Sequence, residues 1–254
     1  MDFSQIDWAG LLPFIGIGFA AQVIDGALGM AFGLINSVML VSVMGVSPAV
    51  ASASVHAVET FTTAASGASH IAHRNVDWRL LPRIAVPGVI GGILGAYVLA
   101  SVDASVARPF VMAYLAAIGL YLLFRAWLGR VEPKDPRVIE PLGLAGGFLD
   151  AAGGGGWGSV VTANLLIQGA EPRRTIGTVN TSEFFVTATI SVTFFLTLGM
   201  AVFTFQAVGL LIGGLLAAPF GGVLARRVPT RPLMAVVGLL LTITSAYTAW
   251  QALA

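Results

Sequence analysis

Four acidic residues of this chain lie inside long apolar stretches, where a charged side chain is costly. They are Asp25, Glu59, Asp150 and Glu183, out of twelve acidic residues, and none of the thirteen basic residues lies in such a stretch. A charge at membrane depth costs at least ~2.5–3.5 kcal/mol on insertion scales and by default marks a functional site. These carboxylates are therefore the first candidates for binding a substrate, carrying a proton or capping a helix.

Polar side chains precede Glu59 and Glu183 at helical spacing. Residues three apart share one helix face, so a polar side chain one turn before each glutamate lies beside it. We interpret Glu59 and Glu183 as coupling or gating groups and the neighbouring neutral side chains as donors to a substrate. These donors are Ser54, His56, Thr178 and Asn180.

Asp25 and Asp150 each precede a glycine-rich run. Unwound backbone is tolerated at membrane depth only where protein or a watery cavity covers it. The half-helix after each run points its free N–H groups at the midplane, and such an end attracts an anion. We therefore add four residues to the candidate anion site: Gly29, Gly154, Gly155 and Trp157. The two aspartates are either coupling or gating groups or N-caps of the half-helices, and both interpretations stay open.

The composition predicts an integral membrane protein. The 254 residues are 57% hydrophobic and 10% charged, and the mean hydropathy is +0.89. No Asp, Glu, Lys or Arg occurs in the 42 residues from Phe184 to Ala225 or in the 23 residues from Pro232 to Ala254. One bilayer crossing needs roughly 20 apolar residues. A soluble all-α protein is the alternative, but it would have to bury more apolar surface than one core can hold.

The chain contains an internal duplication. The segment Asp25–Gly33 aligns with Asp150–Gly158 at an offset of 125 residues, and four further pairs follow in the same order while the offset drifts to 122. These are Gly45–Pro48 with Gly169–Pro172, Ser54–Phe61 with Thr178–Phe185, Gly91-Gly92 with Gly213-Gly214, and Arg108-Pro109 with Arg231-Pro232. Chance is a poor explanation for so many matches in register, so each half is a repeat of about 115 residues.

The basic residues predict how the chain is oriented. Arginine and lysine gather in cytoplasmic loops, so the basic linker between the halves is expected in the cytoplasm and both termini outside. The loop 73–83 carries three arginines and its counterpart 198–206 no charge, whereas 101–108 carries one arginine and its counterpart 226–231 three. This opposite bias predicts an inverted-topology repeat in the cytoplasmic (inner) membrane. The basic residues of the linker are Arg125, Arg130, Lys134 and Arg137.

The segment 142–169 is too short to cross the membrane twice. It lies between the linker and Arg173-Arg174, both expected inside, and it is broken at the glycines 153–156. Each arm covers roughly 20 Å, short of the ~30 Å hydrocarbon core. We therefore expect a helical hairpin that enters and returns, with 11–44 doing the same from the other side. An eight-span arrangement, with each hairpin straightened into one helix, is the alternative.

The predicted fold is an all-α membrane protein in which each half is a Gly-broken helical hairpin followed by three transmembrane helices. The first half, 1–126, has its hairpin at 11–44 and spans near 49–71, 82–101 and 106–126. A cytoplasmic linker occupies 127–140. The second half, 141–254, has its hairpin at 142–169 and spans near 174–198, 207–225 and 232–252.

The repeated glycine-rich hairpin, the Gly-x-x-Pro turn and the polar helix Thr178-x-Asn180-x-x-Glu183 resemble the TauE/SafE family of sulfite and organosulfonate exporters. The resemblance covers about Gly10 to Trp250. It implies export of a small sulfur oxyanion or sulfonate across the inner membrane, driven by an ion gradient. His56 stands where the second half has Asn180, so the site is not symmetric. The motifs fall on Asp25–Gly33, Asp150–Gly158, Ser54–Glu59 and Thr178–Glu183.

Other functions stay open on the residues alone. The carboxylates could bind a cation or metal ion as substrate, although the spans lack the clustered His or Met that a metal favours. Asp25 and Asp150 could form the dyad of an intramembrane aspartyl protease, but neither has a Tyr-Asp or Gly-x-Gly-Asp pattern. Nothing resembles the filter of a channel. Because four carboxylates would repel an anion, either some of them take up protons when it binds or they cap helices away from it.

The expected partners are a small anion and the lipid bilayer. The net charge of +1 gives no indication of nucleic-acid binding. No cofactor, resident metal or enzymatic activity is expected, and a homodimer is left open.

Overall fold

The computed structural model describes residues 8–127, 134–199, 204–227 and 230–253, and these residues are helical with no strand among them. Predicted features on the other residues, among them Arg130 of the linker, lie outside the described part. The helices are α1 (Trp8–Leu28), α2 (Phe32–Val38), the π-helix η2 (Met39–Val43), α3 (Pro48–Ala72), α4 (Leu80–Ser101), α5 (Ala104–Trp127), α6 (Glu140–Gly153), α7 (Trp157–Ile167), α8 (Pro172–Leu198), α9 (Phe205–Ala217), the 3₁₀-helix η4 (Ala218–Phe220), α10 (Gly221–Arg227) and α11 (Thr230–Leu253).

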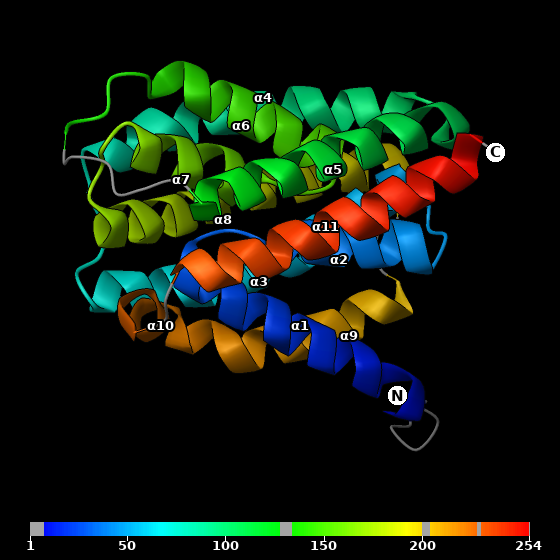
Figure 1. Cartoon of the computed structure of the whole chain (residues 1–254), viewed down its shortest axis with the longest axis horizontal. Helices are drawn as coiled ribbons and strands as arrows, with labels where there is room; N and C mark the ends of the chain where they lie inside the picture. Colours follow the sequence, from blue (N-terminus) through cyan, green and yellow to red (C-terminus); the bar gives the residue numbers. More distant parts are fainter. Residues whose placement is uncertain (1–7, 128–133, 200–203, 228–229, 254) are drawn as a thin grey trace.

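Each segment expected to form a hairpin consists of two helices separated by a short break. Residues 29–31 separate α1 from α2, and residues 154–156 separate α6 from α7. In Figure 1 each pair turns back at its break, so that α3 and α8 begin at the ends where α1 and α6 began. The arms are unequal: α6 has 14 residues and α7 has 11, whereas the 21 residues of α1 reach about 31 Å. The first arm is thus longer than the expected 20 Å.

Four helices in the described part are long and apolar enough to cross a membrane. They cover Gly10–Leu28, Leu80–Ser101, Ala104–Trp127 and Pro172–Leu198. Helix α3 is also long, with 25 residues, but its buried face carries many polar side chains. Shorter apolar helices cover Phe32–Val43, Phe205–Phe220 and Ala235–Tyr247.

The helices pack in pairs that take one member from each half of the sequence. Helix α4 packs against α6 as α9 packs against α1, while α3 packs against α8 and α5 against α11. Glycines permit the close approach. A Cβ atom at Gly91 would lie 2.8 Å from Phe148 N, and one at the corresponding Gly213 would lie 2.7 Å from Phe19 N. The two halves therefore contact each other through all four helix pairs and not through a single interface.

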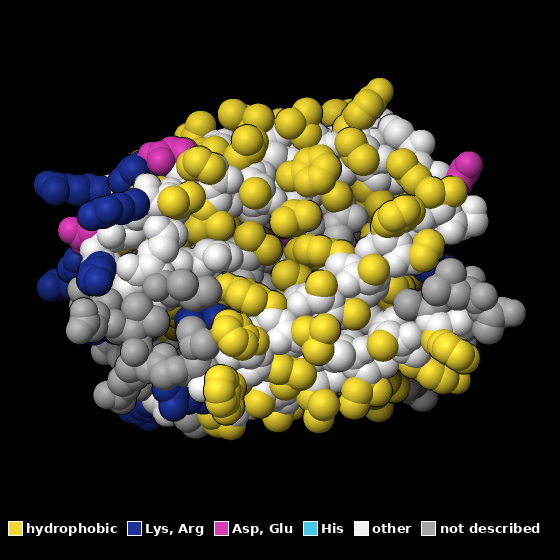
Figure 2. All heavy atoms as spheres, turned by 45° about the horizontal axis from the view of Figure 1, so that its top comes forward, with side chains coloured by type: hydrophobic (Ala, Val, Ile, Leu, Met, Phe, Trp, Pro, Cys, Tyr) yellow, Lys and Arg dark blue, Asp and Glu magenta, His cyan; other side chains and the backbone are white. Residues whose placement is uncertain are grey.

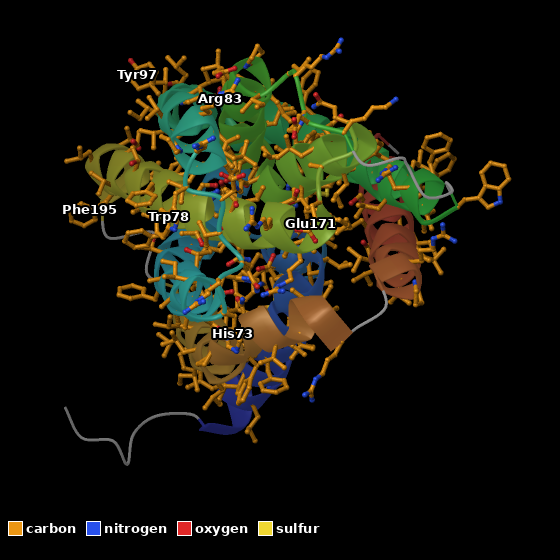
Figure 3. The ribbon with its side chains drawn as sticks, turned by 90° about the vertical axis from the view of Figure 1, so that its left-hand side faces the viewer. His73, Trp78, Arg83, Tyr97, Glu171 and Phe195 are labelled. Atoms are coloured by element: carbon orange, nitrogen blue, oxygen red, sulfur yellow. The ribbon has the colours of Figure 1, made fainter. Side chains whose placement is uncertain are left out.

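The surface divides into an apolar belt and a basic end. On the face in Figure 2, hydrophobic side chains cover the middle, and most visible Lys and Arg gather at the left-hand end. Figure 3 looks onto this basic end, where His73, Trp78, Arg83 and Glu171 are labelled. There Arg83 Nε lies 2.6 Å from Glu140 Oε1 and joins α4 to α6. Both side chains are about half exposed, so water screens this ion pair and it adds little to stability.

Arg125 lies in a helix, as the predicted span 106–126 implies, and not in the solvated linker with whose basic residues it was grouped. It lies in the last turn of α5, and its side chain is only 8% exposed. A cation in the last turn interacts favourably with the negative end of the helix dipole, and its aliphatic stem can cover apolar surface. Helix α5 thus ends at Trp127, one residue beyond the predicted span 106–126.

The orientation can be tested with single cysteines, because the chain has none of its own. Trp78, 62% exposed at the basic end, is expected in the cytoplasm, and Asp103, exposed between α4 and α5, outside. In intact cells a membrane-impermeant maleimide should label Asp103→Cys, and should label Trp78→Cys only after the cells are opened. Labelling of both variants from the same side would contradict the orientation.

Candidate functional site

The four carboxylates singled out by the sequence are all buried. The exposed fractions are 2% for Asp25, 3% for Glu59, 1% for Asp150 and 4% for Glu183. An ionised group removed from water must be paired or hydrogen-bonded to be tolerated. The partners of each carboxylate therefore define the site.

Helices α3 and α8 carry the two glutamates and run antiparallel through the centre of the molecule. Thr60 Oγ1 lies 3.1 Å from Ser191 Oγ, and Thr63 Oγ1 lies 3.5 Å from Thr187 Oγ1. Residue numbers thus increase along α3 in the direction in which they decrease along α8, so the two helices are antiparallel.

Each aspartate pairs with a polar side chain from the other half of the sequence. His56 Nε2 on α3 lies 3.1 Å from Asp150 Oδ2 on α6. Asn180 Nδ2 on α8 donates to Asp25 Oδ2 on α1 over 2.9 Å. The two pairs correspond under the sequence alignment, with His56 in the place of Asn180. Asp25 and Asp150 thus belong to separate pairs, and no hydrogen bond joins their side chains within the described residues.

The surroundings of His56 fix where its proton lies. His56 Nδ1 is 2.7 Å from the carbonyl oxygen of Ser52, which can only accept, so Nδ1 carries a hydrogen. The second nitrogen faces a carboxylate oxygen, another acceptor unless it is protonated. A hydrogen bond between Nε2 and Asp150 therefore requires one proton, held by either partner. Asn180 supplies its own hydrogen, so only the His56–Asp150 pair contains an exchangeable proton.

The aspartates also cap the returning half-helices, as one of the two interpretations anticipated. The N–H of Trp157, the first residue of α7, donates to Asp150 Oδ1 over 2.8 Å. The N–H of Phe32, the first residue of α2, donates to Asp25. Each carboxylate thus occupies an N-terminal position that attracts an anion, and the capping and functional interpretations apply to the same atoms.

Glu59 lies beside the start of α2. Glu59 accepts a hydrogen bond from the N–H of Gly33 in the first turn of α2. A Cβ atom at Gly33 would lie 2.9 Å from Glu59 Oε1, so glycine is needed for this approach. Glu59 Oε2 and Glu183 Oε2 are buried and have no hydrogen-bond partner among the described residues. Asp25, Glu59, Asp150 and Glu183 together form what we call the carboxylate cluster. The two unpartnered oxygens are its least satisfied atoms.

The two breaks interlock at the centre. Gly154, Gly155 and Gly156 have φ values of 78°, 128° and 133°, and Gly29 has 65°, all in a region that favours glycine. A Cβ atom at Gly155 would lie 2.6 Å from the carbonyl carbon of Gly33. The broken backbones thus cover each other, as backbone at membrane depth requires.

Two hydroxyl groups that the sequence interpretation missed satisfy carbonyl groups of the breaks. Ser37 Oγ donates to the carbonyl oxygen of Gly154, and Thr162 Oγ1 donates to that of Gly29 over 3.0 Å. Ser37 and Thr162 are 125 residues apart, the offset of the hairpin motif. Each lies four residues after the last glycine of its motif, Gly33 or Gly158, so the repeat itself indicates this pair of hydroxyl groups.

The remaining predicted site residues include Thr178, Trp157 and Ser54. The hydroxyl of Thr178 accepts from Asp77 N over 2.8 Å and donates to the carbonyl oxygen of Arg174, so it holds a loop. The indole of Trp157 is fully buried, and its Nε1 donates to the carbonyl oxygen of Val179; only its backbone N–H faces the carboxylate cluster. Ser54 is buried on α3.

Comparison with known proteins gives two matches over nearly the whole chain. The family model described as sulfite exporter TauE/SafE matches residues 14–248. The probable membrane transporter protein YtnM of Bacillus subtilis (strain 168) is 40% identical over 247 residues, which cover 94% of this chain and 82% of that protein. No solved structure matches.

The His56–Asp150 pair yields a stability prediction. His56→Leu leaves the buried carboxylate of Asp150 without its side-chain partner, which costs roughly 3–5 kcal/mol and lowers the melting temperature by about 10 °C. His56→Asn copies the pairing of the other half and should lose much less. Thermal unfolding of the purified proteins, followed by tryptophan fluorescence, compares the two. Equal melting temperatures for both variants and the wild type would contradict the pairing.

Proposed function

Because this chain belongs to the sulfite exporter TauE/SafE family of membrane transporters, we propose that it is a secondary transporter that exports a small sulfur-containing anion. The candidate substrates are sulfite, sulfoacetate or a related organosulfonate, moved across the cytoplasmic membrane. The observation that carries the proposal is the carboxylate cluster, in which protein carboxylates occupy the starts of two half-helices. The same donors would suit an oxyanion.

The packing supports an inverted-topology repeat with halves 1–126 and 141–254 joined by the linker 127–140. Corresponding helices α3 and α8 run antiparallel, and the aspartate pairs exchange partners between the halves. In such transporters the substrate site lies near the midplane, where broken helices from opposite sides meet. We infer that both hairpins are re-entrant, that the termini are external and that the anion binds between the breaks.

The donors available to an anion are backbone N–H groups and neutral side chains. At the starts of α2 and α7, the N–H groups of Phe32, Gly33 and Trp157 now face carboxylates. Sulfite and sulfonate groups offer three oxygens on one face, which suits several N–H groups together. The anion would therefore take the place of a protein carboxylate.

This exchange requires that negative charge be removed when substrate enters. A carboxylate that takes up a proton no longer repels the anion and releases its N–H donor. The His56–Asp150 pair holds one exchangeable proton, and the unpartnered oxygens of Glu59 and Glu183 can accept others. We infer that proton and anion bind together, which makes the transport proton-coupled. Because the proton then leaves with the anion, the outward gradient of the anion drives export.

The alternative, transport of a cation or metal ion, has weaker support. Across the described part of the chain, no group of three or more His, Asp or Glu side chains is arranged to hold a metal ion. The carboxylates are instead engaged by N–H donors and by His56 or Asn180, an arrangement for negative charge.

The substrate class can be tested with purified protein in liposomes. We expect sulfite or sulfoacetate to move faster than sulfate or chloride, and faster than in liposomes with the His56→Leu variant. Accumulation should follow an imposed pH gradient. If none of the four anions moves while a divalent or sodium cation does, the anion proposal is wrong.

The coupling groups can be tested by the pH dependence of binding. Protonation frees donors, so a sulfonate that stays ionised should bind the wild type more tightly as pH falls. Glu183→Gln, a neutral mimic of the protonated acid, should bind while losing much of this dependence, and Glu59→Gln should behave likewise if both acids take part. Asp103→Asn, at an exposed loop, is the control. Wild-type binding that is flat with pH, or binding lost in both Gln variants, would exclude the glutamates as proton carriers.

A further inference from the structure

A pocket at the basic end opens between three segments of the chain. Its volume is about 430 Å³, which lies within the range of small-molecule sites. The walls come from the start of α4, the start of α8 and the linker residues 134–139. Four cationic side chains line the pocket, and these are Arg79, Arg83, Lys134 and Arg174.

Hydrogen bonds hold the linker wall against the end of the second hairpin. Gln168 Oε1 accepts from the N–H groups of Arg137 and Val138 over 2.9 Å each, and Gln168 Nε2 donates to the carbonyl oxygen of Val138 over 3.1 Å. The N–H of Lys134 donates to the carbonyl oxygen of Gly169 over 2.9 Å. The pocket is therefore bounded on this side by backbone that is fixed in place.

Two acidic side chains of the pocket are engaged by helix starts. Glu171 is the N-cap of α8, and its carboxylate accepts from the N–H of Arg173 over 3.1 Å and from that of Arg174 over 2.7 Å. Asp77 Oδ1 accepts from the N–H of Arg79 over 2.9 Å, just before α4 begins. Helix starts carry positive partial charge and stabilise such carboxylates. The two negative charges are thus balanced by backbone groups and not by the arginine side chains.

Two arginine side chains of the pocket remain available to a ligand. Arg83 is paired with Glu140, but no hydrogen bond or ion pair joins the guanidinium groups of Arg79 and Arg174 to another residue in the described part of the chain. Arg174 also lines an adjoining pocket of about 410 Å³, together with Arg74. A guanidinium presents parallel N–H donors that match two oxygens of one oxyanion. The pocket therefore favours a small anion.

The pocket opens to water and not to lipid. Figure 3 looks onto the basic end and labels Glu171, a residue of the pocket wall, well inside the outline of the molecule. Tyr97 and Phe195, exposed on the apolar belt, are labelled at the edge of the same view. A lipid headgroup would lie at this edge, above the acyl chains. The ligand of the pocket is therefore expected to be a soluble anion.

We propose that this pocket, which we call the capture pocket, binds the sulfur oxyanion at the cytoplasmic face before transport, with Arg79 and Arg174 as the binding side chains. The inference rests on the proposed function, because it assigns a second site to the same substrate. A concave surface with unpaired positive charge raises the local concentration of an anion. The carboxylate cluster then receives its substrate from this enriched supply.

Binding can be measured at the pocket itself, because the chain has no cysteine of its own. Ala170→Cys places one thiol in the pocket wall, and the rate of its labelling by a maleimide is followed in the purified full-length protein. Sulfoacetate should slow the labelling, whereas chloride at the same ionic strength should not. Asp103→Cys, between α4 and α5, is the control and should label at an unchanged rate. If Ala170→Cys fails to fold, Pro136→Cys reports on the same pocket.

Charge variants in the Ala170→Cys background test the assignment. Arg174→Gln and Arg79→Gln should each raise the half-protecting concentration of sulfoacetate roughly two- to fivefold, the size of one solvent-exposed charge interaction. Asp135→Asn, which removes a carboxylate from the pocket, should lower that concentration. A loss of structure would not shift binding in opposite directions. Arg227→Gln removes a charge from the end of α10 and lines neither pocket, so it should have no effect.

The outcomes separate this site from the proposed function. A wild type that transports a sulfur anion in liposomes, but whose thiol at position 170 is not protected or is protected equally in Arg174→Gln, Arg79→Gln and Arg227→Gln, would overturn the capture pocket alone. Protection by phosphatidylglycerol or inorganic phosphate but not by sulfoacetate would assign the pocket to another anion and would also overturn it. A wild type that transports no sulfur anion would overturn the proposed function as well.

Discussion

The cost of a buried carboxylate is the constraint on which this structure depends. Backbone N–H groups at the starts of α2 and α7 also need partners, because both helices begin inside the protein. Asp25 and Asp150 satisfy both needs, since each accepts from a helix start and from a side chain of the opposite half. The helix start that donates to each aspartate belongs to the same half, but the side-chain partner comes from the other half, so the helices must pack across the two sequence halves.

The departures from symmetry assign different tasks to the two halves. His56 faces Asp150 where Asn180 faces Asp25, so one pair holds an exchangeable proton and the other does not. The polar face of α3 reaches His70, whereas the same face of α8 ends in apolar residues such as Phe194. The two halves therefore differ at α3, which carries both His56 of the proton-holding pair and the longer buried polar face.

The sequence was sufficient for the buried carboxylates and for the glycine breaks, because a charge in an apolar run and a repeated motif are local signals. It could not identify their partners, since the contact of Asp25 with Asn180 spans 155 residues and depends on how the helices pack. Thr178 was assigned to the site by its neighbours in sequence, but its hydroxyl faces another side of α8 and holds Asp77. Arg125 shows that a long basic side chain can still end a buried helix.

The central claim is that substrate replaces a protein carboxylate at a half-helix start, and that this carboxylate takes up a proton. Isothermal titration calorimetry in two buffers of different ionisation enthalpy counts the protons bound with the ligand. With a sulfonate that stays fully ionised at pH 7, we predict uptake of about one proton for each anion bound. Binding of the sulfonate without net proton uptake would contradict the account.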